Sequence, residues 1–97
     1  MKDERLVESL EEVAASLGVK VNYEKIRKMT ARQPRGGFCI VKGEPRIIVH
    51  RPLGASEKVQ VLIESLQGYD LENVFMPPEV RQAIEGAFPL LKRASSE

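Results

Sequence analysis

The chain has 97 residues, the length of one domain, and its 42% hydrophobic residues, 30% charged residues and net charge of +1 are typical of an ordinary globular protein. A single cysteine excludes an internal disulfide framework, and a single histidine with a single cysteine argues against a zinc site of the usual kind. The charged first ten residues show no secretory signal and no apolar run is long enough to span a bilayer, so we expect a cytoplasmic protein without a cofactor or a membrane contact.

The first element that the sequence predicts is a helix over residues 2–17. Leu6, Leu10 and Val13 recur at the spacing of one helix face, while acidic residues occupy the other side. Gly18 follows the last apolar position and is a natural C-cap.

A strand follows the helix. Residues 19–23 alternate between apolar and polar side chains, which predicts a strand with one buried face. Residues 24–29 fit a helical turn or a loop equally well. Residues 30–35 are mostly polar, include a proline and predict a mobile connection with a basic surface.

The stretch from Gly36 to Arg51 predicts a hairpin, because two runs rich in β-branched and aromatic residues flank Gly43-Glu44-Pro45. Its register stays open. A loop of two or four residues groups Phe38, Ile40, Ile47 and Val49 on one face, opposite Cys39, Val41, Ile48 and His50. A loop of three residues groups Cys39, Val41, Ile47 and Val49 instead. Both faces are apolar in every register, so we expect either helices on both faces or one face that forms an interface.

Two helices are predicted after the hairpin. Residues 56–67 carry apolar side chains at helical spacing, with Ser56 as the expected N-cap. Residues 78–88 form the last predicted helix, which begins at Pro78 because proline is tolerated in the first turn.

Taken together, these elements predict one α+β domain over residues 1–91 and a flexible tail over residues 92–97. The expected architecture is a small three-stranded, mainly antiparallel sheet with three helices, in the order α-β-β-β-α-α.

Positive charge is concentrated between residues 20 and 51. Nine lysines and arginines stand there against two glutamates, a local balance of +7, so the remainder of the chain carries −6. This split predicts either a surface for nucleic acid or an acidic partner, or a basic sheet edge that discourages aggregation. The segment lacks the interleaved aromatic residues of common single-strand binders. The residues expected to contact phosphate or acidic groups are Arg27, Lys28, Arg32, Arg35, Arg46 and Arg51.

One possible enzyme site is a pair formed by Cys39 and His50. With a four-residue loop these two side chains lie directly opposite each other, and a histidine beside a cysteine can produce a nucleophilic thiolate. Nothing in the sequence points to an oxyanion hole, however, and a lone cysteine in a strand is usually a small buried hydrophobe.

The order of elements from Gly36 to Gln67, about a third of the chain, resembles the ImmA/IrrE-type minimal metallopeptidase fold. In that fold a Gly-containing strand and a hairpin lead into a helix carrying HExxH, a motif whose position falls here on residues 63–67. Only Glu64 matches and both histidines are absent. The resemblance therefore implies a fold, and neither the family's zinc nor its peptidase activity.

The chain also resembles small bacterial proteins with a Gly-Gly-x-Cys hairpin, here residues 36–39, followed by a Leu-Glu…Pro-Pro segment, here residues 71–78. That resemblance implies no activity.

The function that the sequence favours is a non-catalytic protein-interaction module that self-associates or binds another protein. We expect Phe38, Ile40 and Ile48 at the interface. Electrostatic binding of nucleic acid or an acidic partner through residues 20–51 is the alternative, and an enzyme that uses Cys39 and His50 is the third hypothesis.

Overall fold

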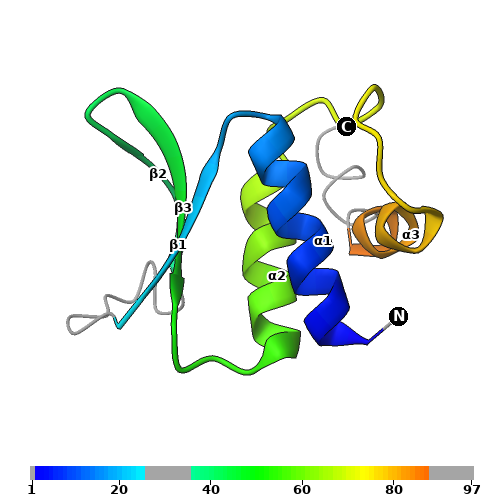
Figure 1. Cartoon of the computed structure of the whole chain (residues 1–97), viewed down its shortest axis with the longest axis horizontal. Coiled ribbons are helices and arrows are strands. Elements are labelled where there is room, and N and C mark those ends of the chain that lie inside the picture. The colour runs from blue at the N-terminus through cyan, green and yellow to red at the C-terminus, as the bar shows by residue number, and fades with distance from the viewer. Residues whose placement is uncertain (1, 26–35, 88–97) are drawn as a thin grey trace, which may run out of the picture.

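The structure is a computed structural model that describes residues 2–25 and 36–87. Its elements in chain order are α1 (Asp3–Ser16), β1 (Lys20–Glu24), β2 (Gly36–Val41), β3 (Glu44–His50), α2 (Ala55–Leu66) and α3 (Pro78–Ala87) (Figure 1). The predicted α+β class and the predicted order of elements are confirmed. The predicted ranges of α1, β1 and α2 differ from these bounds by one residue at each end. The predicted connection over residues 30–35 and the predicted tail over residues 92–97 lie outside the described residues.

The three strands form one mixed sheet in the order β1-β3-β2. The central strand, β3, pairs antiparallel with β2 over six residue pairs and parallel with β1 over five. Within the described part of the chain, β1 and β2 are therefore the two edges of the sheet.

The hairpin closes through a two-residue turn, Lys42 and Gly43, whose φ angles of 53° and 82° are both positive. Such a turn needs left-handed backbone at both central positions, which glycine adopts freely and proline cannot adopt. The predicted Gly-Glu-Pro turn is therefore wrong in its position, because Glu44 and Pro45 belong to β3. Of the registers left open by the sequence, the structure has the one with the two-residue loop, with Phe38 opposite Ile47.

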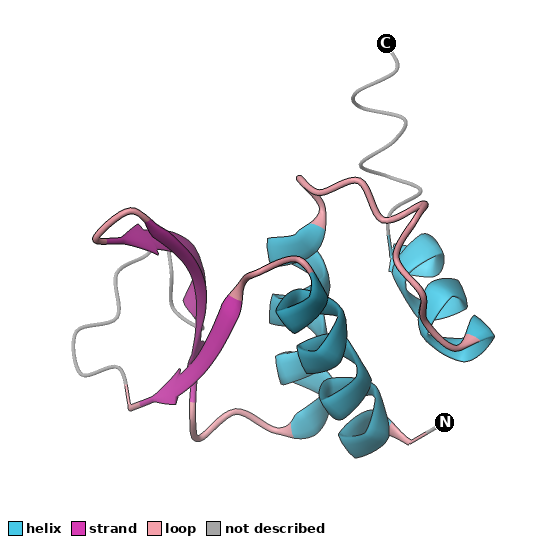
Figure 2. Cartoon of the chain, turned by 45° about the horizontal axis from the view of Figure 1, so that its top comes forward, coloured by secondary structure: helices cyan, strands magenta, loops and turns pink. Residues whose placement is uncertain are grey.

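The helices cover one face of the sheet. α1 and α2 lie side by side against that face, and α3 lies on their far side (Figures 1 and 2). Ile47 and Val49 of β3 pack there against Leu10, Leu62 and Leu66, and all five side chains are fully buried. None of the three described helices lies on the opposite face of the sheet, so within the described residues helices cover one face only, and an interface on the other face stays a prediction.

The helix ends agree in part with the sequence. Gly18 follows α1 with a φ of 79°, the left-handed conformation expected of a C-cap glycine. The predicted N-cap at Ser56 is wrong, since α2 begins one residue earlier and Gly54 occupies the N-cap position. The backbone N–H of Lys58 donates to the Gly54 carbonyl at 3.0 Å, which closes the first turn of α2.

Candidate functional site

Exposed apolar side chains are concentrated on β2. Among the described residues, the large hydrophobic side chains that are exposed are Phe38 (38%), Ile40 (66%), Val41 (38%) and Phe75 (96%). Three of these four lie on one strand. A single exposed hydrophobic residue is normal on a protein surface, whereas several adjacent ones mark a contact site.

β2 is also an edge strand without the usual protection against pairing. Its sequence, GGFCIV, contains no charged residue and no proline. β1, at the other edge, begins with Lys20 and ends with Glu24. Charged residues on an edge discourage pairing with another strand, so among the described residues β1 carries this protection and β2 does not.

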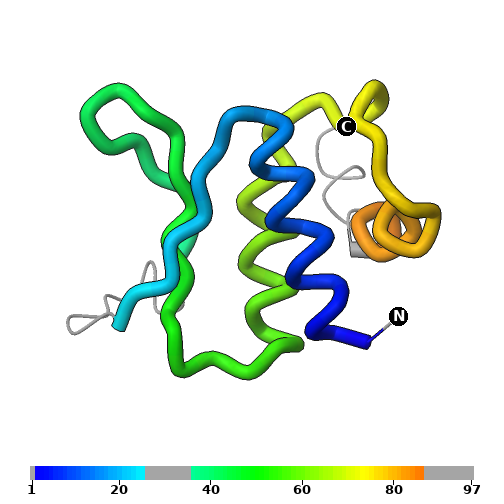
Figure 3. The backbone as a smooth tube through the Cα atoms, viewed as in Figure 1, coloured from blue at the N-terminus to red at the C-terminus, as the bar shows by residue number. Residues whose placement is uncertain are grey.

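The tip of the hairpin extends beyond the three-stranded part of the sheet. β1 pairs with residues 46–50 of β3, so Glu44 and Pro45 have β2 as their strand neighbour in the described structure. Figure 3 shows this tip bending away from the helices. Ile40, opposite Pro45, consequently lacks the helix cover that buries Ile47 and Val49 on the same face.

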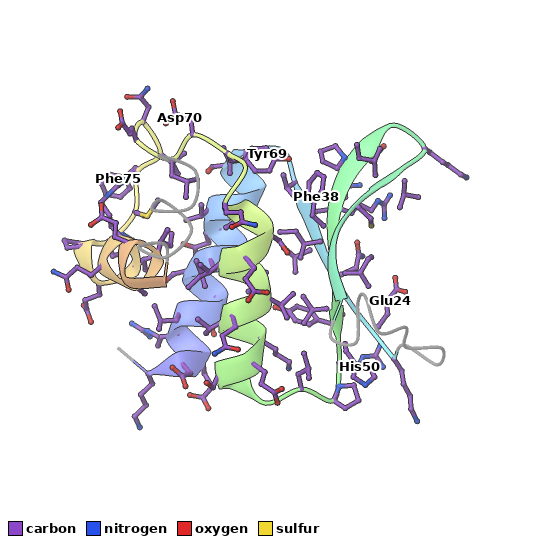
Figure 4. The ribbon with its side chains drawn as sticks, turned by 180° about the vertical axis from the view of Figure 1, so that it is seen from behind. Glu24, Phe38, His50, Tyr69, Asp70 and Phe75 are labelled. Carbon is purple, nitrogen blue, oxygen red and sulfur yellow. The ribbon has the colours of Figure 1, made fainter. Side chains whose placement is uncertain are left out.

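An open pocket of about 520 Å³ lies between β2 and the C-terminal end of α2. Its walls come from β2, from α2 and from the turn that follows α2, and they consist of Gly36, Gly37, Phe38, Val61, Glu64, Ser65, Gln67, Gly68 and Tyr69. The Phe38 and Tyr69 rings meet edge to face, with centroids 6.1 Å apart and an interplanar angle of 67° (Figure 4). The hydroxyl of Ser65 donates to the Val61 carbonyl at 2.7 Å, so its proton is engaged in a hydrogen bond within α2.

The structure separates the three predicted interface residues. Phe38 and Ile40 lie on the helix side of the sheet, and Ile48 lies on the opposite side, because neighbouring residues of a strand point to opposite faces. Ile48 is also half-buried in the central strand. The three residues therefore do not share a face, and their role at an interface stays a prediction. Val41, which the sequence analysis did not place at the interface, is 38% exposed.

The structure does not bring the predicted Cys39–His50 pair together. Cys39 is opposite Arg46, and His50 lies four residues further along β3, roughly 13 Å away at the rise of a strand. Figure 4 shows His50 near the end of the sheet opposite to the hairpin tip. The juxtaposition required a four-residue loop, and the left-handed turn at residues 42–43 excludes that loop.

Two polar atoms on the sheet face opposite the helices have no hydrogen-bond partner among the described residues. Asn22 Oδ1 and Arg46 Nε are both buried there, in the neighbouring strands β1 and β3. An acceptor and a donor without partners are uncommon in buried positions.

The predicted basic surface is only partly described. Arg27, Lys28, Arg32 and Arg35 lie outside the described residues. Arg46 Nη2 lies 3.7 Å from a Glu44 carboxylate oxygen, and the Arg51 guanidinium donates to the Tyr23 carbonyl at 3.1 Å. These two arginines therefore each have one partner within the protein, and their binding to phosphate or acidic groups stays a prediction.

A hydrogen bond joins α1 to β1 on the covered side of the sheet. The Tyr23 hydroxyl donates to Glu11 Oε2, and Lys58 Nζ lies 5.2 Å from the centre of the Tyr23 ring. Burial, the hydrogen bond to Glu11 and the negative charge of Glu11 together raise the pKa of Tyr23 above its ordinary value of about 10.

This raised pKa makes part of the stability depend on pH. The unfolded chain loses the tyrosine proton near pH 10, and the folded chain loses it only at higher pH. The contribution of Tyr23 to the free energy of unfolding is therefore fully present below about pH 10 and disappears as the pH rises further. We expect Tyr23→Phe to lower the free energy of unfolding by about 1 kcal/mol at pH 7. The difference from the unmodified protein should shrink above about pH 10, as measured by urea unfolding. A difference that stays constant across this range would contradict the assignment.

Two further observations bear on the chemistry available to the described residues. No three or more His, Cys, Asp or Glu side chains are grouped there in a way that could hold a metal ion. None of the helices in residues 2–25 and 36–87 has the length and apolar character needed to cross a membrane.

No family model matches the chain, and neither a curated protein nor a solved structure matches it. The two resemblances drawn from the sequence stay predictions. The function is therefore argued from the geometry of β2 and its surroundings.

Sequence reasoning found Phe38 and Ile40 and missed the pocket beside them. Tyr69 and Glu64 come to β2 because α2 runs back along the hairpin, a long-range contact that no local pattern encodes. The sequence carries no local signal for Tyr69, because its ring contact is with Phe38, a residue far away along the chain.

Proposed function

We propose that this chain is a non-catalytic protein-interaction module that self-associates by pairing its β2 edge with the β2 edge of a second copy. The observation that supports this proposal most strongly is an edge strand that is uncharged along its whole length and exposes Phe38, Ile40 and Val41. Pairing would give the outer backbone groups of β2 hydrogen-bond partners and would remove these side chains from water.

A second copy suits this edge because β2 is complementary to itself. In an antiparallel pair of identical strands, residues from one end face residues from the other end. All six residues of β2 are uncharged, so no like charges meet within the paired strands. The same pairing would extend the three-stranded sheet to six strands and would support the projecting tip, since an isolated two-stranded ribbon is only marginally stable in water.

The test is a charge placed on the edge. We expect Ile40→Lys to weaken dimer formation by about tenfold or more, because the new ammonium group would have to be buried in the interface or would hold the strands apart. Sedimentation equilibrium measures the dissociation constants of the variant and of the unmodified protein.

The matched control is Phe75→Lys. This change makes the same exchange of an exposed hydrophobic residue for lysine, at a position that is 96% exposed and lies away from β2 (Figure 4). The control should dimerise like the unmodified protein. Equal dissociation constants for Ile40→Lys and the unmodified dimer would place the interface elsewhere and would overturn the proposal.

A further inference from the structure

We infer a specific register for this dimer, in which the two β2 strands cross a two-fold axis at Cys39. The inference rests on the proposed function, because it assumes that two copies pair through β2. It adds which residues face each other and where Ile40, the most exposed hydrophobic side chain of β2, is buried.

Symmetry restricts the register before any side chain is considered. When a two-fold axis relates two neighbouring antiparallel strands of one sheet, the axis is perpendicular to the sheet. A residue and its copy in the other strand therefore point to the same face of the sheet. Directly opposite residues always share a face, and faces alternate along a strand. The axis must therefore pass beside one residue, which then faces its own copy. Only Phe38, Cys39 and Ile40 are central enough for most of β2 to pair.

Side-chain size selects among these three positions. With Cys39 on the axis, Phe38 of each copy faces Ile40 of the other, so the two exposed apolar residues on the helix side cover each other, while Val41 faces Gly37. With Phe38 on the axis, Ile40 would face Gly36, which has no side chain to cover it. With Ile40 on the axis, Phe38 would face the charged Lys42 and the two glycines of β2 would extend past the partner's turn.

The pocket beside Phe38 gives this register a second source of support. Ile40 of the other copy would lie next to Phe38 on the helix side, at the mouth of the pocket that Tyr69 also lines. The register therefore places an exposed apolar side chain beside the Phe38 and Tyr69 rings, at both ends of the interface at once.

The native cysteine reports this register directly, because it is the only one in the chain. Directly opposite residues have Cα atoms about 4.5–5.5 Å apart, within the range that a disulfide can bridge. Diamide oxidises two such thiols to one disulfide and takes up their two protons and two electrons. We expect diamide to convert the unmodified protein to a covalent dimer on a non-reducing gel, and we expect Ile40→Lys to suppress that conversion.

The matched control moves the cysteine by two residues on the same face. In Cys39→Ser with Val41→Cys, the two thiols would lie about 14 Å apart along the strands, too far for a disulfide. We expect this variant to form at least about tenfold less covalent dimer than the unmodified protein at the same sedimentation-measured dimer fraction.

The outcomes separate the register from the proposed function. Two outcomes with a noncovalent dimer would overturn the register and leave the proposed function standing. In one, the cysteine at position 41 cross-links as well as Cys39. In the other, Cys39 does not cross-link. A protein that stays monomeric and forms no covalent dimer would overturn both.

Discussion

Gly36→Ala is expected to lower the free energy of unfolding by about 3 kcal/mol or more, a large part of the total stability of a domain this size. A Cβ atom at this position would lie 1.9 Å from the Ile48 carbonyl oxygen and 2.8 Å from its carbon. Both are backbone atoms of the central strand, so no side-chain rotation can relieve the overlap. The φ of Gly36, 107°, adds a second penalty because side chains disfavour left-handed backbone.

Gly43→Ala separates these two penalties. Gly43 also has a left-handed φ, 82°, but a Cβ atom there would meet no other atom within 4 Å. We expect this control to lose about 1–2 kcal/mol, the conformational penalty alone. Urea unfolding of both variants measures the difference. Similar losses would mean that β2 does not approach β3 as closely at Gly36 as the structure shows.

Leu62→Ala is expected to have the second large effect, a loss of about 3–4 kcal/mol. Leu62 is fully buried in α2, at the centre of the layer between the sheet and the helices. Shortening it removes apolar contacts and leaves a cavity that the surrounding helices and strands can only partly fill. Thermal unfolding should show a melting temperature lower by more than about 10 °C.

Phe75→Ala is the control for this prediction. The change also removes a large apolar side chain, but Phe75 is 96% exposed, so its loss should change stability by less than about 0.5 kcal/mol. A Leu62→Ala variant as stable as Phe75→Ala would contradict the position of α2 in the core.

The sequence predicted most of the fold because its local signals are strong. The apolar spacing in α1 and α2 and the alternation in β1 each place an element within one residue of its observed bounds. These patterns record which side of an element is buried, and burial is the largest favourable term in folding.

The hairpin register was harder to predict because several turns fit the same residues. A proline near the middle of the segment suggested that the turn included Pro45, whereas positive φ angles at Lys42 and Gly43 place the turn before it. Because of that shift of the turn, Cys39 faces Arg46 and not His50, so the Cys39–His50 pair does not form. Turn chemistry, rather than apolar pattern, was the missing information.

The candidate site was predicted only in part for a similar reason. Phe38 and Ile40 could be found from their apolar character within a strand. That β2 is an edge strand, and that the end of α2 forms a pocket beside it, follows from the strand order and from long-range packing. Neither feature is encoded in a short stretch of sequence.

The central claim is that the chain associates with itself, and the mass of the unmodified protein in solution tests it most directly. Sedimentation equilibrium over protein concentrations from about 1 µM to about 1 mM covers the affinities expected of a small interface. We predict that the average mass rises with concentration from the 10.9 kDa of one chain to twice that value and goes no higher. A mass that stays at 10.9 kDa throughout would contradict self-association through β2.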